Sequence, residues 1–214
     1  MTREYYSEQL RKLNEELISM GDLCEEAMAL VMKALREKDE SIAEGVHKIE
    51  QDIDQKERDI EAMCMKLLLR QQPVAGDLRN ISSALRMIAD MERIGDQTAD
   101  IADATKYLTS LQFEVHPSIF IMGDMVTKMV DDSVNAFVRR DKKLARQVIA
   151  ADDMVDELFN QLKAELVEDI KKGTDPEHAG YQLDMLMVIK YLERIGDHAT
   201  NIGEWVIYSI AGQK

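Results

Sequence analysis

Apolar residues recur every three or four positions along most of the chain, the spacing that places them on one face of an α-helix. Ile81, Leu85 and Ile88 form one such stripe. Only three prolines and ten glycines interrupt the pattern, so long segments run without a breaker. The pattern predicts an all-α protein, and turn residues divide it into six helical segments. We expect these segments at about residues 7–37, 42–72, 78–108, 118–140, 141–172 and 176 to nearly the C-terminus.

Short polar residues mark several helix ends. Asp77 is predicted to be the N-cap of the third helix, because an aspartate side chain accepts hydrogen bonds from the free backbone N–H groups of a first turn. Gly173, Asp175 and Pro176 indicate a stop followed by a restart. Glycine suits the residue after a helix, aspartate suits the N-cap, and proline suits the first helical position.

The sequence contains an internal repeat. The pentapeptide Glu-Arg-Ile-Gly-Asp occurs at residues 92–96 and again at 193–197, so its copies start 193 − 92 = 101 residues apart. Asp39 returns as Asp141, an offset of 102. The repeat predicts two tandem, pseudo-symmetric three-helix bundles with up-down topology. We place the first bundle at 1–110, a connector at 111–117 and the second bundle at 118–214.

The charge of the chain narrows the range of its partners. It carries 27 basic and 41 acidic residues, a formal net charge of 27 − 41 = −14. Nucleic acid is therefore not expected as a partner, because its phosphates would be repelled. Cations, in contrast, would be attracted.

The sequence also indicates a compartment. Its first residues do not resemble a secretory signal, and no apolar run approaches the roughly 18 residues that cross a bilayer. Cys24 and Cys64 cannot form a disulfide framework and belong to no ligand-like cluster, so we expect two buried thiols in a reducing cytosol. We therefore expect a soluble cytoplasmic protein, with peripheral membrane association left open.

Acidic residues continue the apolar stripe of the third helix. After Ile88 come Glu92 and Asp96, which lie only about 40° apart around a helix, on the face that should be buried. Gly95 lies beside them, and we expect it to let another backbone approach closely. The sixth helix repeats the arrangement at 193–197.

The second and fifth helices supply matching acid pairs one turn apart, at Glu50 and Asp54 and at Asp152 and Asp156. Four partly desolvated carboxylates in each bundle repel one another unless cations neutralise them or their pKa values rise. Oxygen ligands suit hard cations such as iron(III), manganese, magnesium or calcium, and so many carboxylates could bridge several ions. His198 is a weaker candidate ligand.

Two alternatives weigh against a metal centre. Acid pairs on exposed helix faces are common, so the chain could be a structural or interaction module that binds metal only adventitiously. A carboxylate-bridged di-iron enzyme would need two Glu-x-x-His motifs, and only Glu44 to His47 provides one. Because no nucleophile or general-base arrangement is present either, we do not expect an enzyme.

With these features together, the chain resembles the PhoU family of phosphate-transport regulators over essentially its whole length. The resemblance rests on the duplicated unit, on Asp77-Leu78-Arg79, and on the motifs at 92–102 and 193–204. It implies two three-helix bundles, each with a multinuclear metal centre; iron is the first candidate, then zinc, manganese or magnesium. The ligands that it implies are Glu50, Asp54, Glu92 and Asp96 with Asp100 nearby, and Asp152, Asp156, Glu193 and Asp197 with Asn201 nearby.

The resemblance also implies a regulatory role. PhoU proteins link the ATPase of a phosphate ABC transporter to a sensor histidine kinase, and they negatively regulate phosphate uptake and the phosphate-starvation response. Dimers are common in the family, so a homodimer is expected. Arg79 has no counterpart in the second half, where Gly180 stands, so any role of this arginine belongs to the first bundle.

Overall fold

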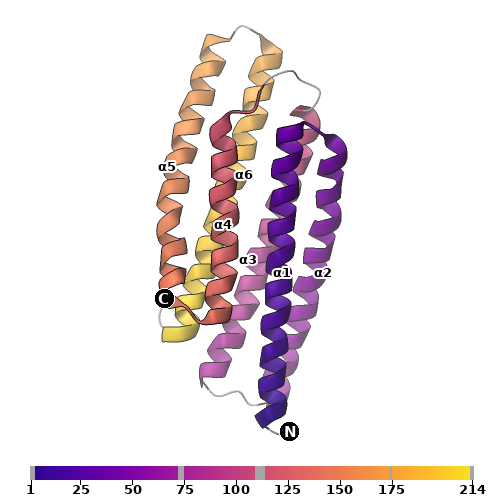
Figure 1. Cartoon of the computed structure of the whole chain (residues 1–214), viewed down its shortest axis with the longest axis vertical. Coiled ribbons are helices and arrows are strands. Elements are labelled where there is room, and N and C mark those ends of the chain that lie inside the picture. Colours follow the sequence, from indigo (N-terminus) through magenta and orange to yellow (C-terminus); the bar gives the residue numbers. More distant parts are fainter. Residues whose placement is uncertain (1–2, 72–74, 109–113, 174, 213–214) are drawn as a thin grey trace.

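The computed structural model describes residues 3–71, 75–108, 114–173 and 175–212. This part of the chain forms six α-helices that run alternately up and down, which confirms the predicted fold class (Figure 1). Their bounds are Arg3–Glu37 for α1, Glu40–Gln71 for α2, Ala75–Leu108 for α3, Pro117–Arg139 for α4, Lys142–Lys172 for α5 and Pro176–Ala211 for α6.

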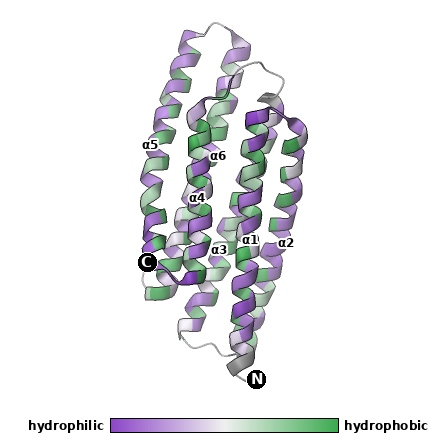
Figure 2. Cartoon of the chain, viewed as in Figure 1, coloured by the Kyte–Doolittle hydropathy of each residue, from purple (hydrophilic) through white to green (hydrophobic). Residues whose placement is uncertain are grey.

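The helices form two bundles that lie side by side. Helices α1, α2 and α3 contact one another, as do α4, α5 and α6, while α3 packs along α6 and α1 along α4. Helices α2 and α5 lie at opposite outer sides (Figure 1). Buried apolar side chains from all six helices join one continuous core. Hydrophobic and hydrophilic positions alternate along each helix, as one buried face requires (Figure 2).

Some predicted helix ends are correct and others are not. Asp175 is the N-cap of α6, and its carboxylate accepts from the backbone N–H of Glu177 at 3.1 Å. Asp77 is not an N-cap, because α3 already begins at Ala75 and the aspartate lies in its first turn. There its negative charge still favours the positive end of the helix dipole. Gly173 ends α5 with φ −76°, so it makes no use of the left-handed region.

Residues 111–113 of the predicted connector, 111–117, lie outside the described residues. Residues 114–116 are described and are not helical, and Pro117 already begins α4. The boundaries 1–110 and 118–214 stay a prediction.

The repeat extends to the turns between helices. Lys38 and Arg140, which are 140 − 38 = 102 residues apart, both have φ 53°, a left-handed conformation uncommon outside glycine. The next residue in each copy, Asp39 or Asp141, accepts a hydrogen bond at 2.9 Å from the backbone N–H two positions later. A strained turn and its capping aspartate therefore occur in both halves.

The cysteines and the hydropathy of the helices agree with expectations from the sequence. Cys24 and Cys64 are free and buried, as expected. Among the described residues, no helix combines the length and apolar character needed to cross a membrane.

Candidate metal centres

Three carboxylates converge in the first bundle. Glu50 and Asp54 lie one turn apart on α2, and Asp96 lies on α3, which packs against α2. One oxygen from each lies within 4.8 Å of the other two, and all three side chains are partly buried. Such a group fits a hard cation, because its donors are oxygens and it is open enough to be reached.

The α3 acids are held by an arginine of the same helix. Arg93 Nη1 donates to Asp96 Oδ2 at 3.0 Å, and its Nε lies 3.4 Å from Glu92 Oε2. Burial, followed by the charge of Asp96, still raises the pKa of Glu92. Burial and the charges of Asp54 and Asp96 likewise raise the pKa of Glu50. The carboxylates are therefore incompletely neutralised by protein groups, and a bound cation would relieve this repulsion.

Asp100 lies one turn beyond Asp96 and is exposed. Burial of part of its carboxylate raises its pKa, and the charges of Asp96 and Asp103 add to the effect. Its carboxylate therefore interacts electrostatically with the first centre, but it does not belong to the converging group of three acids.

In the second bundle Asp152 carries the strongest electrostatic perturbation of its centre. Burial, followed by the charges of Asp197, Asp156 and Glu193, raises its pKa to about 6. Its Oδ1 is buried without a hydrogen-bond partner. A buried carboxylate oxygen with this surplus of negative charge around it fits a cation site.

A lysine distinguishes the second centre from the first. Lys190 Nζ forms an ion pair with Glu193 and lies 5.4 Å from the centre of the Phe159 ring. The Lys190 charge opposes the burial and acidic neighbours that raise the pKa of Asp197. The counterpart of Lys190 in the first half, at 190 − 101 = 89, is Ala89. Among the described residues no converging group of three donors forms in this bundle.

Asn201 and His198 both contact Asp90, an acid of the first bundle. Asn201 Nδ2 donates to Asp90 Oδ1 at 3.2 Å, and His198 Nδ1 lies 2.9 Å from the same oxygen. Because Asp90 is on α3, both side chains bind across the seam between the bundles. The repeat pattern did not reveal Asp90, since its counterpart is Tyr191; the only signal was its spacing of three and four residues from the apolar Met87 and Ile94.

The two glycines of the repeated pentapeptide do not admit a backbone, contrary to expectation. A Cβ on Gly95 would meet the side chain of Ile53 at 3.1 Å, and one on Gly196 would meet Asp152 Oδ1 at 3.4 Å. Each glycine therefore makes room for a side chain of the neighbouring helix. A backbone does approach Gly203, where a Cβ would lie 3.2 Å from the carbonyl oxygen of Ala145.

Arg79, found only in the first half, lies near the end of α6. Its side chain is 3.6 Å from the position that a Cβ would take at Gly212, which ends α6 with φ 74°. A positive charge there favours the negative end of the α6 dipole. The structure thus brings this arginine to the second bundle's last helix.

Comparison with known proteins supplies a relationship for the whole chain. The family model for the PhoU domain matches it twice, at residues 17–105 and 119–206. The "Phosphate-specific transport system accessory protein PhoU homolog" of Clostridium acetobutylicum is 38% identical over 216 aligned positions, covering 100% of this chain and 98% of that protein. A homolog of the same name from Pseudomonas putida is 35% identical over 98% of this chain and 82% of its own length.

Solved structures agree with this relationship. The crystal structure of PhoU from Pseudomonas aeruginosa is similar with a TM-score of 0.91 and 34% identity, covering 97% of this chain and all of that one. The phosphate transport system regulatory protein PhoU from Streptococcus pneumoniae gives a TM-score of 0.90 at 27% identity, covering 97% of this chain and 98% of that one. The chain therefore belongs to the PhoU family.

Proposed function

We propose that this protein is a cytoplasmic accessory protein of a phosphate-specific transport system, which restrains phosphate uptake and the phosphate-starvation response. It links the transporter ATPase to a sensor histidine kinase and acts as a homodimer. The observation that carries this proposal is the full-length match to accessory proteins of that system, which includes both copies of the family domain. The names of these relatives describe an accessory protein and no reaction, so an adaptor fits the match better than an enzyme does.

Deletion of the gene tests the regulatory proposal. In medium rich in phosphate, a reporter driven by a phosphate-responsive promoter should become active in the deletion strain and silent again after complementation. Unchanged reporter activity in the deletion strain would contradict the proposal. Sedimentation of the purified protein separately tests the homodimer, which should have twice the mass of one chain.

We propose further that each bundle holds metal ions on its carboxylates, with iron as the first candidate. In the first bundle Glu50, Asp54 and Asp96 would bind the ions, with Glu92 beside them. Asp152, Asp156, Glu193 and Asp197 would do so in the second. The ions would supply the positive charge that these crowded carboxylates lack. The convergence of three oxygens within 4.8 Å supports the first centre, and the orphaned Asp152 Oδ1 supports the second.

Elemental analysis of protein purified without added metal or chelator tests this second proposal. Several equivalents of iron, zinc or manganese per chain are expected, and replacing Glu92 and Asp96 by alanine should lower the count. Asp22 and Glu26 offer a matched control, because they are exposed acids one turn apart on α1. The count should fall in the first double variant and stay constant in the second. Equal counts in both would refute the assignment.

A further inference from the structure

The two bundles differ in the length of their first helices. Helix α1 has 35 residues and α4 has 23, a difference of 35 − 23 = 12 residues, or about 18 Å of helix. With the offset of 102, Pro117 at the start of α4 corresponds to Glu15, so the first turns of α1 have no counterpart in α4. Figure 1 shows α5 and α6 extending beyond the start of α4.

In the first bundle those extra turns cover the core. Leu13 is fully buried there, and Tyr6 and Leu10 pack against the core from the same helix. They follow a spacing of four and three residues, so they lie on one face. In the first bundle, therefore, the first turns of α1 fill the position that α4 leaves uncovered in the second bundle.

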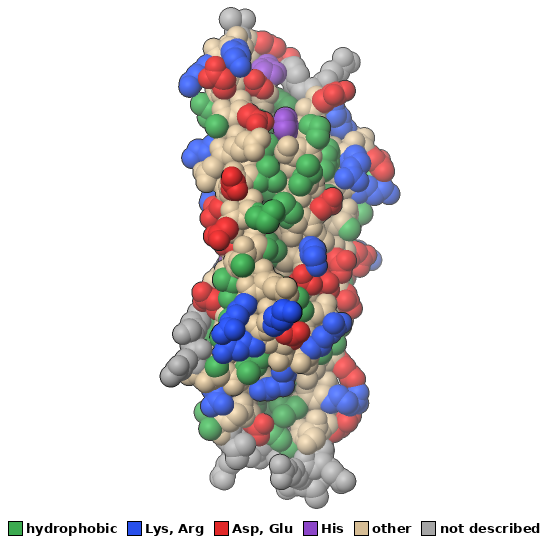
Figure 3. All heavy atoms as spheres, turned by 60° about the vertical axis from the view of Figure 1, so that its left-hand side comes forward, with side chains coloured by type: hydrophobic (Ala, Val, Ile, Leu, Met, Phe, Trp, Pro, Cys, Tyr) green, Lys and Arg blue, Asp and Glu red, His purple; other side chains and the backbone are tan. Residues whose placement is uncertain are grey.

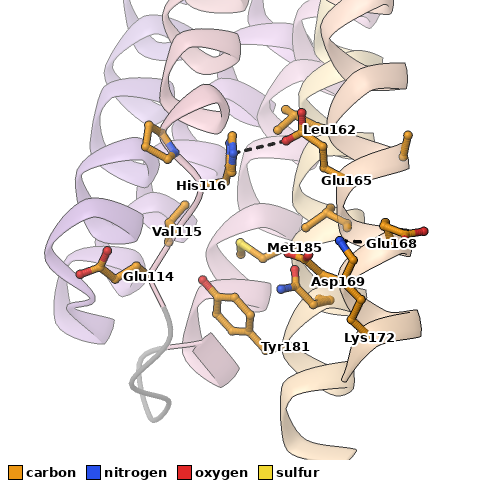
Figure 4. A pocket seen from close by; sticks show the side chains of 14 residues that line it. Glu114, Val115, His116, Leu162, Glu165, Glu168, Asp169, Lys172, Tyr181 and Met185 are labelled. Carbon is orange, nitrogen blue, oxygen red and sulfur yellow. Dashed lines mark ion pairs between the residues drawn. The ribbon is translucent and has the colours of Figure 1, made fainter. Parts of the chain in front are cut away.

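In the second bundle a pocket of about 650 Å³ lies at that position, between segment 114–117, the last turns of α5 and the start of α6. Leu162, Leu166 and Met185 contribute apolar atoms to it, and the ring of Tyr181 forms part of the wall. Figure 4 shows Tyr181 and Met185 between segment 114–117 and α5. The volume falls within the range of about 300–1,000 Å³ that is usual for binding pockets.

Carboxylates dominate the polar lining. The pocket is lined by four acids, one lysine and one histidine: Glu114, Glu165, Glu168, Asp169, Lys172 and His116. Lys172 lies 3.8 Å from Glu168. The Ser118 backbone N–H donates to His116 Nδ1, and Nε2 of the same ring lies 3.3 Å from Glu165. The acids and the lysine give the lining a formal charge of −4 + 1 = −3.

The acids are a departure from the repeat. Glu165 and Asp169 correspond, at the offset of 102, to Met63 and Leu67 in the first bundle. Leu67 is buried in the core. The first bundle covers apolar side chains with its own helix α1, whereas the second bundle presents carboxylates around an open pocket. On the face seen in Figure 3, a cluster of lysines and arginines lies in the lower half, while histidine and acidic side chains lie near the top.

We propose that this pocket binds a basic amphipathic helix of a partner protein, about three turns long, in the place that the first turns of α1 occupy in the other bundle. Its apolar side chains would repeat the spacing of Tyr6, Leu10 and Leu13 and enter the pocket. Its lysines or arginines would pair with Glu114, Glu165 and Asp169 around the rim. Helix-in-groove binding of this kind uses apolar anchors for affinity, and the charges choose the partner. The site lies outside both carboxylate centres and does not depend on bound metal.

A designed peptide tests the proposal with the full-length protein. A labelled peptide of about 14 residues, roughly four turns, would keep the Tyr and Leu spacing of α1 and carry lysine at the polar positions. Fluorescence anisotropy should show saturable binding that weakens with salt. The double substitution Glu165→Gln and Asp169→Asn should weaken binding by about tenfold or more, since two charge pairs are lost.

Two tryptophan variants separate pocket binding from general attraction to an acidic protein. Ala164 is exposed and lines the pocket, so Ala164→Trp should block the peptide without disturbing the core. Ala150 is exposed on the same helix outside the pocket, so Ala150→Trp should bind normally. Circular dichroism melts would show that both variants fold.

Three results would overturn the proposal. One is equal binding by Ala164→Trp, and another is equal binding of a peptide with glutamate in place of lysine. The third is tighter binding of the polyamine spermidine than of the peptide, which would make the pocket a site for small cations. None of these results affects the reporter phenotype that tests the proposed regulatory function, so the two ideas fail separately.

Discussion

Replacing Asp152 by asparagine should stabilise the metal-free protein and weaken its second metal centre. Burial and four neighbouring acids raise the pKa of Asp152 from 3.8 to about 6 in the folded state. The folded protein therefore binds this proton more tightly than the unfolded chain does. Stability from this residue is greatest at low pH and is lost as the pH rises from about 3.8 to 6. Asparagine fits the same space and carries no charge at any pH.

The size of the effect follows from the pKa difference of 6 − 3.8 = 2.2. At 1.36 kcal/mol per pKa unit this is about 3 kcal/mol. Part of the carboxylate is open to solvent, and screening reduces the gain to about 1–2 kcal/mol. For a chain of this length, we expect the Tm above pH 7 to rise by about 3–6 °C. Near pH 4 the gain should be small, because Asp152 is then protonated in the folded protein.

Thermal unfolding followed by circular dichroism, in chelator at several pH values, measures this difference. The exposed Asp124 provides the control, since Asp124→Asn removes the same charge from the same bundle without relieving a crowded site. Added manganese should raise the Tm of the wild-type protein more than that of Asp152→Asn, because a ligand bound to the native state stabilises it. An unchanged or lowered Tm of Asp152→Asn at pH 8 in chelator would refute the reasoning.

Three other predictions follow from single contacts. Lys190→Ala should tighten metal binding at the second centre by about tenfold in calorimetric titrations, because the cation paired with Glu193 is removed. Lys163→Ala is the control and should change the affinity little. Lys163 lies near the same aromatic ring but forms no ion pair with an acid in the described part of the chain. Gly203→Ala should lower the free energy of unfolding in urea by about 1–3 kcal/mol, because the new Cβ would crowd a backbone oxygen. Gly180→Ala should raise that free energy by up to about 1 kcal/mol, because its Cβ would meet open space. Burial raises the pKa of both cysteines to about 12, so a thiol reagent at pH 8 should label them only at the rate of unfolding.

The sequence was sufficient where a feature depends on one helix or on the repeat. Periodicity alone puts Glu92 and Asp96 on the buried side of their helix, and the offset of 102 makes Asp39 and Asp141 equivalent residues. Asn201 could not be placed in this way, because its partner depends on how α3 and α6 are aligned against each other. The contribution of Lys190 to the second centre was not predicted either. The repeat reveals only residues that both halves share, and this lysine has no counterpart in the first half.

The seam between α3 and α6 has the geometry of a two-fold symmetric interface. Asp90 on α3 accepts from Asn201 on α6. The equivalent positions, at an offset of 101, are Tyr191 and Asp100, and burial followed by the Asp100 charge raises the pKa of Tyr191. One half thus meets the other as two identical subunits would, residue i facing j and j facing i. The chain is in this sense a covalently fused dimer of three-helix units, whose seam cannot be lost by dilution as that of two separate subunits can.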